Sequence, residues 1–340
     1  MSKKNSIVLK RKDCFSNSEQ LSEIYSDFTK KILKLKARKF LVAVSGGSDS
    51  LALAAMCRAM HLNYKKIKFF YIHINHGIRK KSLSESKRVK KILKKQHILL
   101  RIINNKKKII NNIQHNARQV RYSLLVKECK KKKIKFILTG HHKDDQIETF
   151  LIRLSRGSGV QGLSAMSAIS DFNNKIKIFR PFLSESKKNL ILISKKIFSK
   201  YVKDPSNNNK KFLRSNVRKL LPILSRHGIG SEQILRSINN LKSSSHTINN
   251  YFKEIIKKIV KQKGKEIYIK KNELFSLNEE LQLRVLGFVI KSLNKSDYPP
   301  RSKKIFTALK HLNSSKEIKH QLGGCLLINR DKYIYVEKSL

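Results

Sequence analysis

The sequence is poor in cysteine and has no long apolar run, and both shortages exclude classes of protein. Its four cysteines (Cys14, Cys57, Cys129 and Cys325) include no Cys-x-x-Cys pair, which argues against structural zinc, an iron–sulfur cluster and a disulfide framework. No apolar run reaches the roughly 18 residues that a membrane-spanning helix needs, and the first residues lack the apolar core of a signal peptide. We therefore expect a cytoplasmic protein with no membrane partner.

Acidic residues are also scarce. The chain has 23 Asp+Glu against 76 Lys+Arg, which gives a formal net charge of +53. Such an excess predicts a polyanionic partner, and RNA is the obvious candidate. A+T-rich coding, which raises lysine, asparagine and isoleucine together, is an alternative source of part of this charge. Affinity for nucleic acid should follow in either case, because phosphate contacts depend on charge.

Short apolar segments alternate with helical patterns over the first part of the chain. They predict strands at 39–44, 67–74, 98–103 and 135–139, with helices over 49–62, 82–96 and 110–132. Such alternation is typical of an α/β fold with a doubly wound, mostly parallel, Rossmann-like sheet. In these sheets ligands bind beyond the carboxyl ends of the strands.

The domain organisation is expected to change after the α/β part. At 340 residues the chain can hold two domains, each with its own core. We assign a basic N-terminal lead-in with one helical stretch to 1–37, a catalytic domain to 38–220 and a mainly helical C-terminal domain to 221–340. In the last domain the patterns predict helices and a closing hairpin. The helices span 210–226, 231–261, 272–293 and 302–312, and the hairpin strands are 325–329 and 333–337.

The most informative segment is Ser-Gly-Gly-Ser-Asp-Ser at 45–50, between a buried strand and an apolar helix. A glycine turn that opens a helix points backbone N–H groups and the positive end of the helix dipole at an anion. The two glycines let the main chain approach a phosphate closely. The Gly-x4-Gly-Lys-Ser/Thr pattern of the P-loop is missing. An ordinary serine-glycine turn is the alternative interpretation.

A second constellation follows the strand at 135–139 and opens the next helix. It contains His141, and it places Asp145 and Glu148 three residues apart, on one helical face. Two carboxylates and an imidazole near a phosphate site could coordinate Mg²⁺, accept an ammonium group or take a proton from an amine. The alternative is an acidic first turn favoured by the helix dipole.

Three further segments carry polar groups that could reach a nucleotide. Arg156 precedes a glycine-rich loop at 157–162, and Arg118 and Arg121 are neighbours on one helical face. A glycine C-cap and a surface arginine pair are the respective alternatives. The third segment follows the second predicted strand through a glycine turn, where a base or ribose could be contacted. Its candidate residues are His73, Asn75 and His76, and satisfied structural histidines are the alternative there.

These motifs together resemble known families. Ser-Gly-Gly-x-Asp-Ser resembles the pyrophosphate loop of the N-type ATP pyrophosphatases, which split ATP into AMP and pyrophosphate. As a set, the motifs resemble those of the tRNA(Ile)-lysidine synthetase family. The matching segments are 45–50, 73–79, 117–122, 141–149, 156–163, 180–183, 204–207 and 214–218. Two departures are Tyr201, where members commonly have Trp, and Lys203, where many have an acidic residue.

The resemblance implies an ATP-dependent ligase that modifies tRNA. Its substrates would be free L-lysine and the wobble cytidine, at position 34, of a CAU-anticodon tRNA(Ile). The base would first be adenylated with loss of pyrophosphate, and the lysine ε-amine would then attack C2 and release AMP. The product, lysidine, would change codon reading from AUG to AUA and amino-acid identity from Met to Ile. Homodimerisation is left open.

The resemblance also implies roles for individual residues. The expected ATP-binding residues are Ser45, Gly46, Gly47, Ser48, Asp49, Ser50, His73, Asn75 and His76, with Asp49 near Mg²⁺. The expected catalytic residues are Asp49, Arg121, His141, Asp145 and Glu148. Lysine or tRNA would contact Asp145, Glu148, Arg118, Arg156, Arg214 and Arg218. A 2-thiocytidine or thiouridine synthetase is the alternative, disfavoured by the unpaired cysteines, and a basic RNA-binding protein without activity is another.

Overall fold

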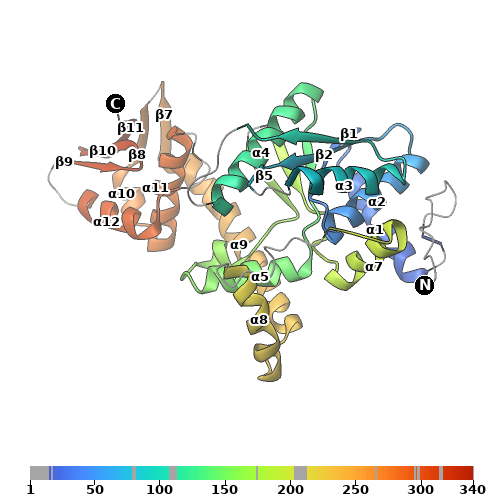
Figure 1. Cartoon of the computed structure of the whole chain (residues 1–340). Coiled ribbons are helices and arrows are strands. Elements are labelled where there is room, and N and C mark those ends of the chain that lie inside the picture. The colour runs from blue at the N-terminus through green and yellow to red at the C-terminus, as the bar shows by residue number, and fades with distance from the viewer. Residues whose placement is uncertain are drawn as a thin grey trace. The chain divides into compact units, whose positions relative to one another are not determined.

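The computed structural model divides the chain into two compact units, Met1–Leu241 and Lys242–Leu340 (Figure 1). It describes residues 15–16, 18–78, 82–106, 113–173, 175–202, 213–264, 266–294, 296, 299–313 and 317–339. Helix α9 (Ser231–Ile259) runs across the boundary in sequence. Within the described residues, no helix is both long enough and apolar enough to cross a membrane.

The first unit is built on a six-stranded sheet with the order β3-β2-β1-β4-β6-β5. Its strands are β1 (Lys39–Ala43), β2 (Lys68–Asn75), β3 (Leu100–Asn104), β4 (Phe136–Leu138), β5 (Ile169–Asn173) and β6 (Ile176–Phe179). Its helices are α1 (Glu19–Lys34), α2 (Ser48–Asn63), α3 (Ser82–Lys94), α4 (Ile113–Lys132), α5 (Lys143–Leu154), α6 (Val160–Leu163), α7 (Lys187–Phe198) and α8 (Leu213–Arg226). Neighbouring strands pair in parallel except at the edge, where β5 is antiparallel to β6. The expected doubly wound, mostly parallel sheet is confirmed.

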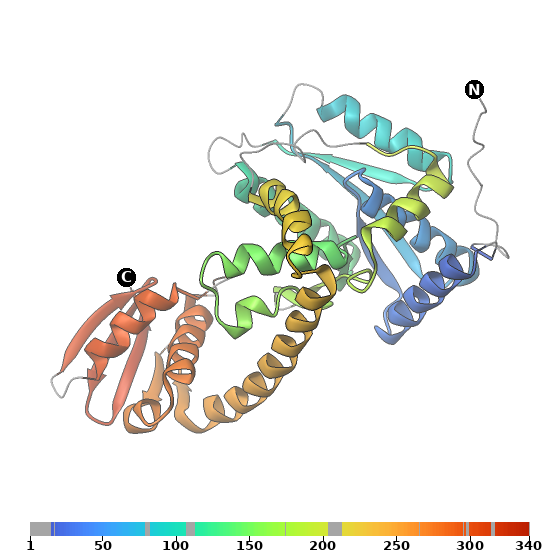
Figure 2. The ribbon, with the colours of Figure 1, turned by 90° about the horizontal axis from the view of Figure 1, so that it is seen from below.

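Helices cover both faces of this sheet (Figure 2). Because side chains alternate along a strand, Phe40 and Val42 of β1 pack with residues of α1, α2, α3 and α7. Leu41, between them, joins the second core with residues of α4. The apolar run that predicted a buried central strand therefore supplies both cores.

Helix α2 is apolar on nearly all sides because it lies inside the first core. Leu51, Met56 and Met60 are fully buried, and so are the alanines between them. A helix that is apolar all round must be covered on every side, and α2 packs against β1, α1 and α7. This burial fixes the position of its N-terminus, which carries the Ser-Gly-Gly motif.

Helix α1 contributes to the same core, although the sequence analysis placed it in a basic lead-in. Leu21, Ile24, Phe28 and Ile32 are buried, at the spacing of one helical face. Because charged residues lie between them, the composition of this segment does not reveal its apolar face. Four further elements, α6, β5, β6 and α7, were not predicted. Lysines interrupt the apolar segments of β6 and α7, serine and aspartate interrupt that of β5, and α6 is a short helix in the glycine-rich segment.

The second unit combines helices with a five-stranded antiparallel sheet of order β7-β8-β11-β10-β9. Its strands are β7 (Val260–Lys263), β8 (Glu266–Lys270), β9 (Ile318–Leu322), β10 (Cys325–Arg330) and β11 (Tyr333–Lys338). Besides the C-terminal part of α9, its helices are α10 (Lys271–Phe275), α11 (Glu279–Asn294) and α12 (Ser302–Leu312). The closing hairpin, now β10 and β11, is confirmed. Strands β7, β8 and β9 were not predicted, since their sequences alternate with lysine and other polar residues.

A close backbone contact joins β4 to α2 in the first unit. A Cβ atom on Gly140 would lie 2.7 Å from the carbonyl oxygen of Asp49 and 2.9 Å from its carbonyl carbon. Only a residue without a side chain lets the chain leave β4 so close to the start of α2.

We expect Gly140→Ala to destabilise the protein by about 1–3 kcal/mol, because backbone rather than a flexible side chain must move. Urea denaturation of the variant measures the free energy of unfolding. Gly159→Ala is the matched control, since a Cβ there meets nothing within 4 Å. Equal losses in the two variants would contradict the interpretation of the contact.

Candidate active site

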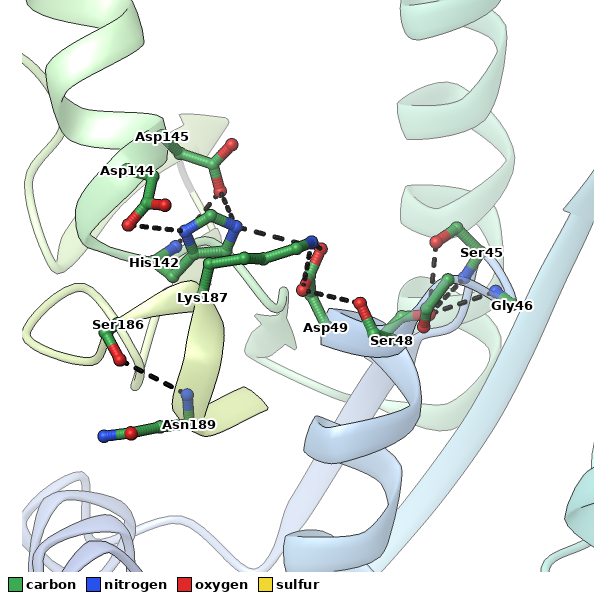
Figure 3. Close-up of polar contacts among 12 residues, drawn as sticks. Ser45, Gly46, Ser48, Asp49, His142, Asp144, Asp145, Ser186, Lys187 and Asn189 are labelled. Atoms are coloured by element: carbon green, nitrogen blue, oxygen red, sulfur yellow. Dashed lines mark hydrogen bonds and ion pairs between the residues drawn. The ribbon is translucent and has the colours of Figure 1, made fainter. Parts of the chain in front are cut away.

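The conformation of the loop after β1 depends on Gly46 and on the hydroxyl group of Ser50. Gly46 has a φ of +97°, and a Cβ there would lie 2.5 Å from a methyl group of Val89. The Ser50 hydroxyl accepts hydrogen bonds from the backbone N–H groups of Ser45 at 3.1 Å and Gly46 at 3.0 Å, and it donates to the carbonyl of Gly47 at 3.0 Å (Figure 3). The loop is therefore preorganised at the N-terminus of α2, as a phosphate site requires.

Three helix N-termini meet next to this loop. Helix α2 begins at Ser48, α5 at Lys143 and α7 at Lys187. The backbone N–H of Lys143 donates to the carbonyl of Glu185 at 2.8 Å, which ties the start of α5 to the segment before α7. Each N-terminus presents a partial positive charge, so their convergence favours an anionic ligand.

Asp49 lies where these helices meet and is paired with a lysine. Both of its carboxylate oxygens accept hydrogen bonds from Lys187 Nζ at 2.6 Å (Figure 3). His142 Nε2 lies 3.8 Å from an Asp49 oxygen and 3.4 Å from an Asp145 oxygen. The structure thus brings the two strongest motifs, 45–50 and 139–149, to one place.

The two acids of α5 lie on the same side of the helix but have different partners. Asp145 accepts a hydrogen bond from the backbone N–H of His142 at 3.1 Å, so it caps its own helix. Glu148 forms a bidentate ion pair with Arg218 of α8, from Nε to Oε1 at 2.5 Å and from Nη2 to Oε2 at 3.3 Å. Both acids are buried. The capping alternative therefore holds for Asp145, and it does not account for Glu148.

His141 lies beside a cluster of arginines. Its Nδ1 is 2.8 Å from the hydroxyl oxygen of Thr139. Burial, followed by the charges of nearby guanidinium groups, holds the pKa of His141 well below its usual range. In decreasing order of effect, those groups belong to Arg180, Arg118, Arg214 and Arg121. His141 is therefore a neutral imidazole in a positive environment at physiological pH.

The predicted pair on α4 belongs to this cluster. The guanidinium carbons of Arg118 and Arg121 lie 4.9 Å and 5.4 Å from the ring centroid of Tyr122. The ring of Tyr122 stacks in turn on Phe172 at 4.9 Å. Burial is the main cause of a lowered pKa for Arg121. These aromatic contacts orient both guanidinium groups without neutralising them.

The strand-end residues of β2 have mainly structural partners. His73 has both ring nitrogens engaged, Nδ1 with the carbonyl of Val44 at 2.8 Å and Nε2 with the hydroxyl of Ser86 at 2.9 Å. Asn75 donates to Asn104 at 3.0 Å and accepts from the N–H of Gly77 at 3.1 Å. These two residues match the structural alternative, and they position the end of the strand.

His76 differs from them. Its Nδ1 is buried and has no hydrogen-bond partner within the part of the chain that the structure describes. Burial, then the positive charge of Arg121 and the neighbouring His73, lowers the pKa of His76 to about 4. A neutral ring with a free buried nitrogen could receive a polar group of a ligand.

The glycine-rich loop after α5 is held by Arg153, whereas Arg156 was predicted to contact lysine or tRNA. Arg153 Nη1 donates to the carbonyls of Gly162 at 2.6 Å and Ala165 at 2.8 Å. Arg156 is exposed, and so is Arg214 on α8. Both guanidinium groups are therefore accessible to a polyanion.

Sequence reasoning missed Lys187 and Arg180 as site residues. Arg180 is buried, and its Nη1 donates to the carbonyl of Ser167 and the hydroxyl of Ser170. A usable signal for Lys187 was its place directly after Ser186, the N-cap of α7. In a chain with 76 Lys+Arg, one such lysine does not stand out.

Some predicted features lie outside the described residues, among them Arg79, Lys203 and the segment 204–207. Among the residues that are described, no group of three or more His, Cys, Asp or Glu could hold a metal ion. Mg²⁺ commonly binds through one or two carboxylates together with substrate phosphates. The donor set at Asp49, one accessible carboxylate beside an anion site, fits a Mg²⁺ ion carried by a nucleotide.

The site and the fold agree with comparisons to known proteins. Residues 17–224 match the model of the PP-loop domain family. The tRNA(Ile)-lysidine synthase of Wolbachia pipientis wMel is 35% identical over 288 residues, which cover 84% of this chain and 67% of that protein. The enzyme of the same name from Orientia tsutsugamushi (strain Boryong) is 32% identical over 317 residues, or 88% and 70%.

Among solved structures, the U34-tRNA thiolase NcsA from Methanococcus maripaludis, with its [4Fe-4S] cluster, is similar with a TM-score of 0.53. It is 20% identical, and the match covers 65% of this chain and 78% of that chain. At this identity the likeness concerns the fold alone. The fold and the site define a PP-loop protein that uses ATP. The chain belongs to the tRNA(Ile)-lysidine synthase family.

The shifted pKa of His76 predicts how stability depends on pH. The pKa of His76 is about 4 in the folded protein, against an ordinary value of 6.5. As the pH falls, the unfolded state therefore binds a proton before the folded state does. Stability is therefore lost as the pH falls from about 6.5 towards 4. Between pH 7 and pH 5 the expected loss is about 1–2 kcal/mol, discounted for partial exposure.

Urea denaturation over this pH range should show a flatter profile for His76→Asn than for the natural protein. His115→Asn, at an exposed position on α4, should keep the natural slope. An unchanged slope in His76→Asn would show that the pKa of His76 is not lowered in the folded protein.

Proposed function

We propose that this protein joins the ε-amine of free L-lysine to C2 of the wobble cytidine of a CAU-anticodon tRNA(Ile). The observation that carries the proposal is the meeting of a phosphate loop, a buried pair of acids and an arginine cluster at the carboxyl ends of the strands. Names of the curated relatives support the same reaction. A cytoplasmic location, where tRNA, ATP and lysine occur together, is part of the proposal.

The loop 45–50 would hold the pyrophosphate part of ATP. Backbone N–H groups and three helix N-termini stabilise the charge that develops on the leaving group. Asp49 would hold Mg²⁺, which when bound adds further charge stabilisation. The ammonium group of Lys187 would then leave Asp49 and bind a phosphate oxygen, since it already lies beside the loop.

The arginine cluster would hold the α-phosphate and the reacting base. The cytosine O2 attacks the α-phosphate, the bond to the pyrophosphate oxygen breaks, and an adenylated base forms. Arg121 and Arg118 are placed to stabilise the phosphate. Because its ring is neutral, His141 can form a hydrogen bond with ATP or the base without adding charge to the site. His76, with its free nitrogen, is a second candidate for such a contact.

The acids of α5 would receive lysine. Its ε-amine attacks C2 of the adenylated base, AMP leaves, and the amine loses a proton. Asp145 and Glu148 can accept ammonium hydrogen bonds, and either could take that proton. The second unit and the exposed basic residues of the first would bind the tRNA backbone through phosphate contacts, which are salt-sensitive.

The cysteines do not support the thiolase alternative. Those that the structure describes, Cys57, Cys129 and Cys325, are buried and unpaired. Burial raises the pKa of all three thiols, that of Cys129 to about 12 with a contribution from the Glu128 carboxylate. Sulfur transfer needs accessible thiolates of low pKa.

The experiment that tests the function is incubation of the pure protein with ATP, Mg²⁺, radiolabelled lysine and CAU-anticodon tRNA(Ile). We expect acid-stable label on the tRNA together with release of pyrophosphate and AMP. Release of pyrophosphate without lysine label would leave ATP use intact and reject lysine as the second substrate. The absence of both pyrophosphate release and lysine label would favour an RNA-binding protein without activity.

Asp49→Asn should reduce tRNA-dependent pyrophosphate release by at least about 100-fold, because the carboxylate for Mg²⁺ is lost. tRNA affinity, measured by filter binding, should be nearly unchanged. Normal turnover in this variant would show that the Asp49 carboxylate does not take part in the reaction.

Lys187→Met should lower the rate of pyrophosphate release by about 100- to 1,000-fold, the usual effect of losing one charge-stabilising donor. Lys188→Met is the matched control on the next residue of α7. ATP binding by isothermal calorimetry separates a loss of rate from a loss of affinity. Equal rates for both variants would show that Lys187 serves only to neutralise Asp49.

A further inference from the structure

The antiparallel sheet of the second unit is covered by helices on one face. Alternate residues of its strands, such as Ile269, Leu327 and Ile334, are buried in a core with residues of helices α9 to α12. Because side chains alternate along a strand, the residues between them point to the opposite face. These residues are all half-buried or exposed. The sheet therefore has a face that solvent can reach, which we call the open face.

One row of side chains crosses the open face from edge to edge. Paired residues on neighbouring strands lie on the same face of a sheet. Across β7, β8, β11, β10 and β9, the register places in one row Lys261, Tyr268, Tyr335, Ile328 and Lys319. Both lysines are exposed. The row therefore has a cation at each edge of the sheet and an aromatic and aliphatic centre.

Three tyrosines form this centre. The ring centroid of Tyr268 lies 5.0 Å from that of Tyr335 and 6.4 Å from that of Tyr333, with interplanar angles of 69° and 86°. Rings in such edge contacts cover less of one another's faces than stacked rings do. The Tyr268 hydroxyl donates to Glu266 Oε2 at 2.6 Å, which helps to orient that ring. Aromatic rings held on a sheet in this way are a surface on which unpaired RNA bases stack.

The composition of the open face favours nucleic acid over a protein partner. Lys263, Lys270 and Arg330 add positive charge to this face, and Glu266 and Glu337 are its acids, so cations outnumber acids. Protein interfaces are enriched in tyrosine but depleted in lysine. Proteins that bind single-stranded nucleic acid combine positive groups, which follow the backbone, with aromatic rings, on which successive bases stack. The open face has both features.

The bases of a duplex are already stacked on one another, so only unpaired nucleotides can use these rings. We propose that the open face binds unpaired nucleotides of the tRNA by stacking their bases on Tyr268 and Tyr335, while Lys261 and Lys319 contact the adjoining phosphates. This inference rests on the proposed function for the identity of the RNA. It adds to that function a base contact, which phosphate binding alone does not provide.

The test replaces one tyrosine in the full protein. Tyr335→Leu keeps an apolar cover on the sheet and removes the aromatic plane. It should weaken binding of a single-stranded oligoadenylate by about 5- to 150-fold, the effect of losing one base stack, and leave binding of an RNA duplex unchanged. Tyr335→Phe keeps the ring and should bind both RNAs as the natural protein does. Tyr251→Leu, at an exposed position on α9, is the matched control and should also bind normally.

Salt dependence separates stacking from charge. Tyr335→Leu should lower the affinity for tRNA without changing the slope of log K against log salt concentration. Lys261→Met should reduce that slope by about 1, the loss of one phosphate contact. At saturating tRNA, Tyr335→Leu should incorporate lysine at the natural rate, because the candidate active site lies in the first unit.

The outcomes distinguish this inference from the function on which it rests. Unchanged oligoadenylate affinity in Tyr335→Leu, or an equal loss for oligoadenylate and duplex, would overturn the inference alone. A dimer of the natural protein that dissociates in this variant, measured by analytical ultracentrifugation, would instead assign the open face to a second copy of the chain. Failure of the natural protein to incorporate lysine, with the oligoadenylate results as expected, would reject the proposed function and leave a surface that stacks RNA bases.

Discussion

The proposed site depends on the close approach of two backbones, at Gly140 after β4 and at Asp49 in α2. A Cβ at Gly140 would come within 2.7 Å of the Asp49 carbonyl oxygen. Because β1 and β4 are neighbours in the sheet, this contact brings the N-terminus of α5 beside that of α2. The phosphate loop and the acids that would receive lysine are therefore parts of one rigid arrangement. An in-line transfer followed by amine attack needs such fixed spacing, since small displacements of reacting groups greatly reduce rates.

The site separates charges of opposite sign over a short distance. Arginines surround His141, and no acid contributes to the shift of its pKa. On the other side, Asp49, Asp145 and Glu148 act together on Arg218. A phosphate group is favoured in the first region and an ammonium group in the second. Two of these three carboxylates, those of Asp145 and Glu148, are buried, and acids are almost never fully buried unless they are paired.

Much of this arrangement could be predicted from the sequence where the signal is local. The strand, glycine turn and apolar helix around 45–50 follow from periodicity, and the meeting of the motifs follows from the rule for the carboxyl ends of parallel strands. The contacts of Lys187 and Arg180 could not be predicted, because they depend on where distant segments fold back. The strands β5 to β9 were hidden for another reason. Lysine and other polar residues at alternate positions give a polar average, although residues between them such as Ile267 and Ile269 are buried.

The internal ion pairs have a consequence for how substrates bind. Leaving Glu148 without a partner would cost free energy, because an unpaired buried charge is strongly destabilising, and the partly exposed Asp49 is paired as well. Lys187 and Arg218 meet this need in the protein without ligands. Under the proposed function, the group that would bind Asp49 is a cation, so it would replace Lys187, whose charge would then be free for phosphate. At Glu148 the arginine would not need to leave, because within the described residues the Nη1–Nη2 edge of its guanidinium group donates to no further partner. Under the proposed function, binding at Asp49 would therefore exchange one ion pair for another and would leave neither charge without a partner, so the same residues would stabilise the protein before substrates bind and recognise substrates afterwards.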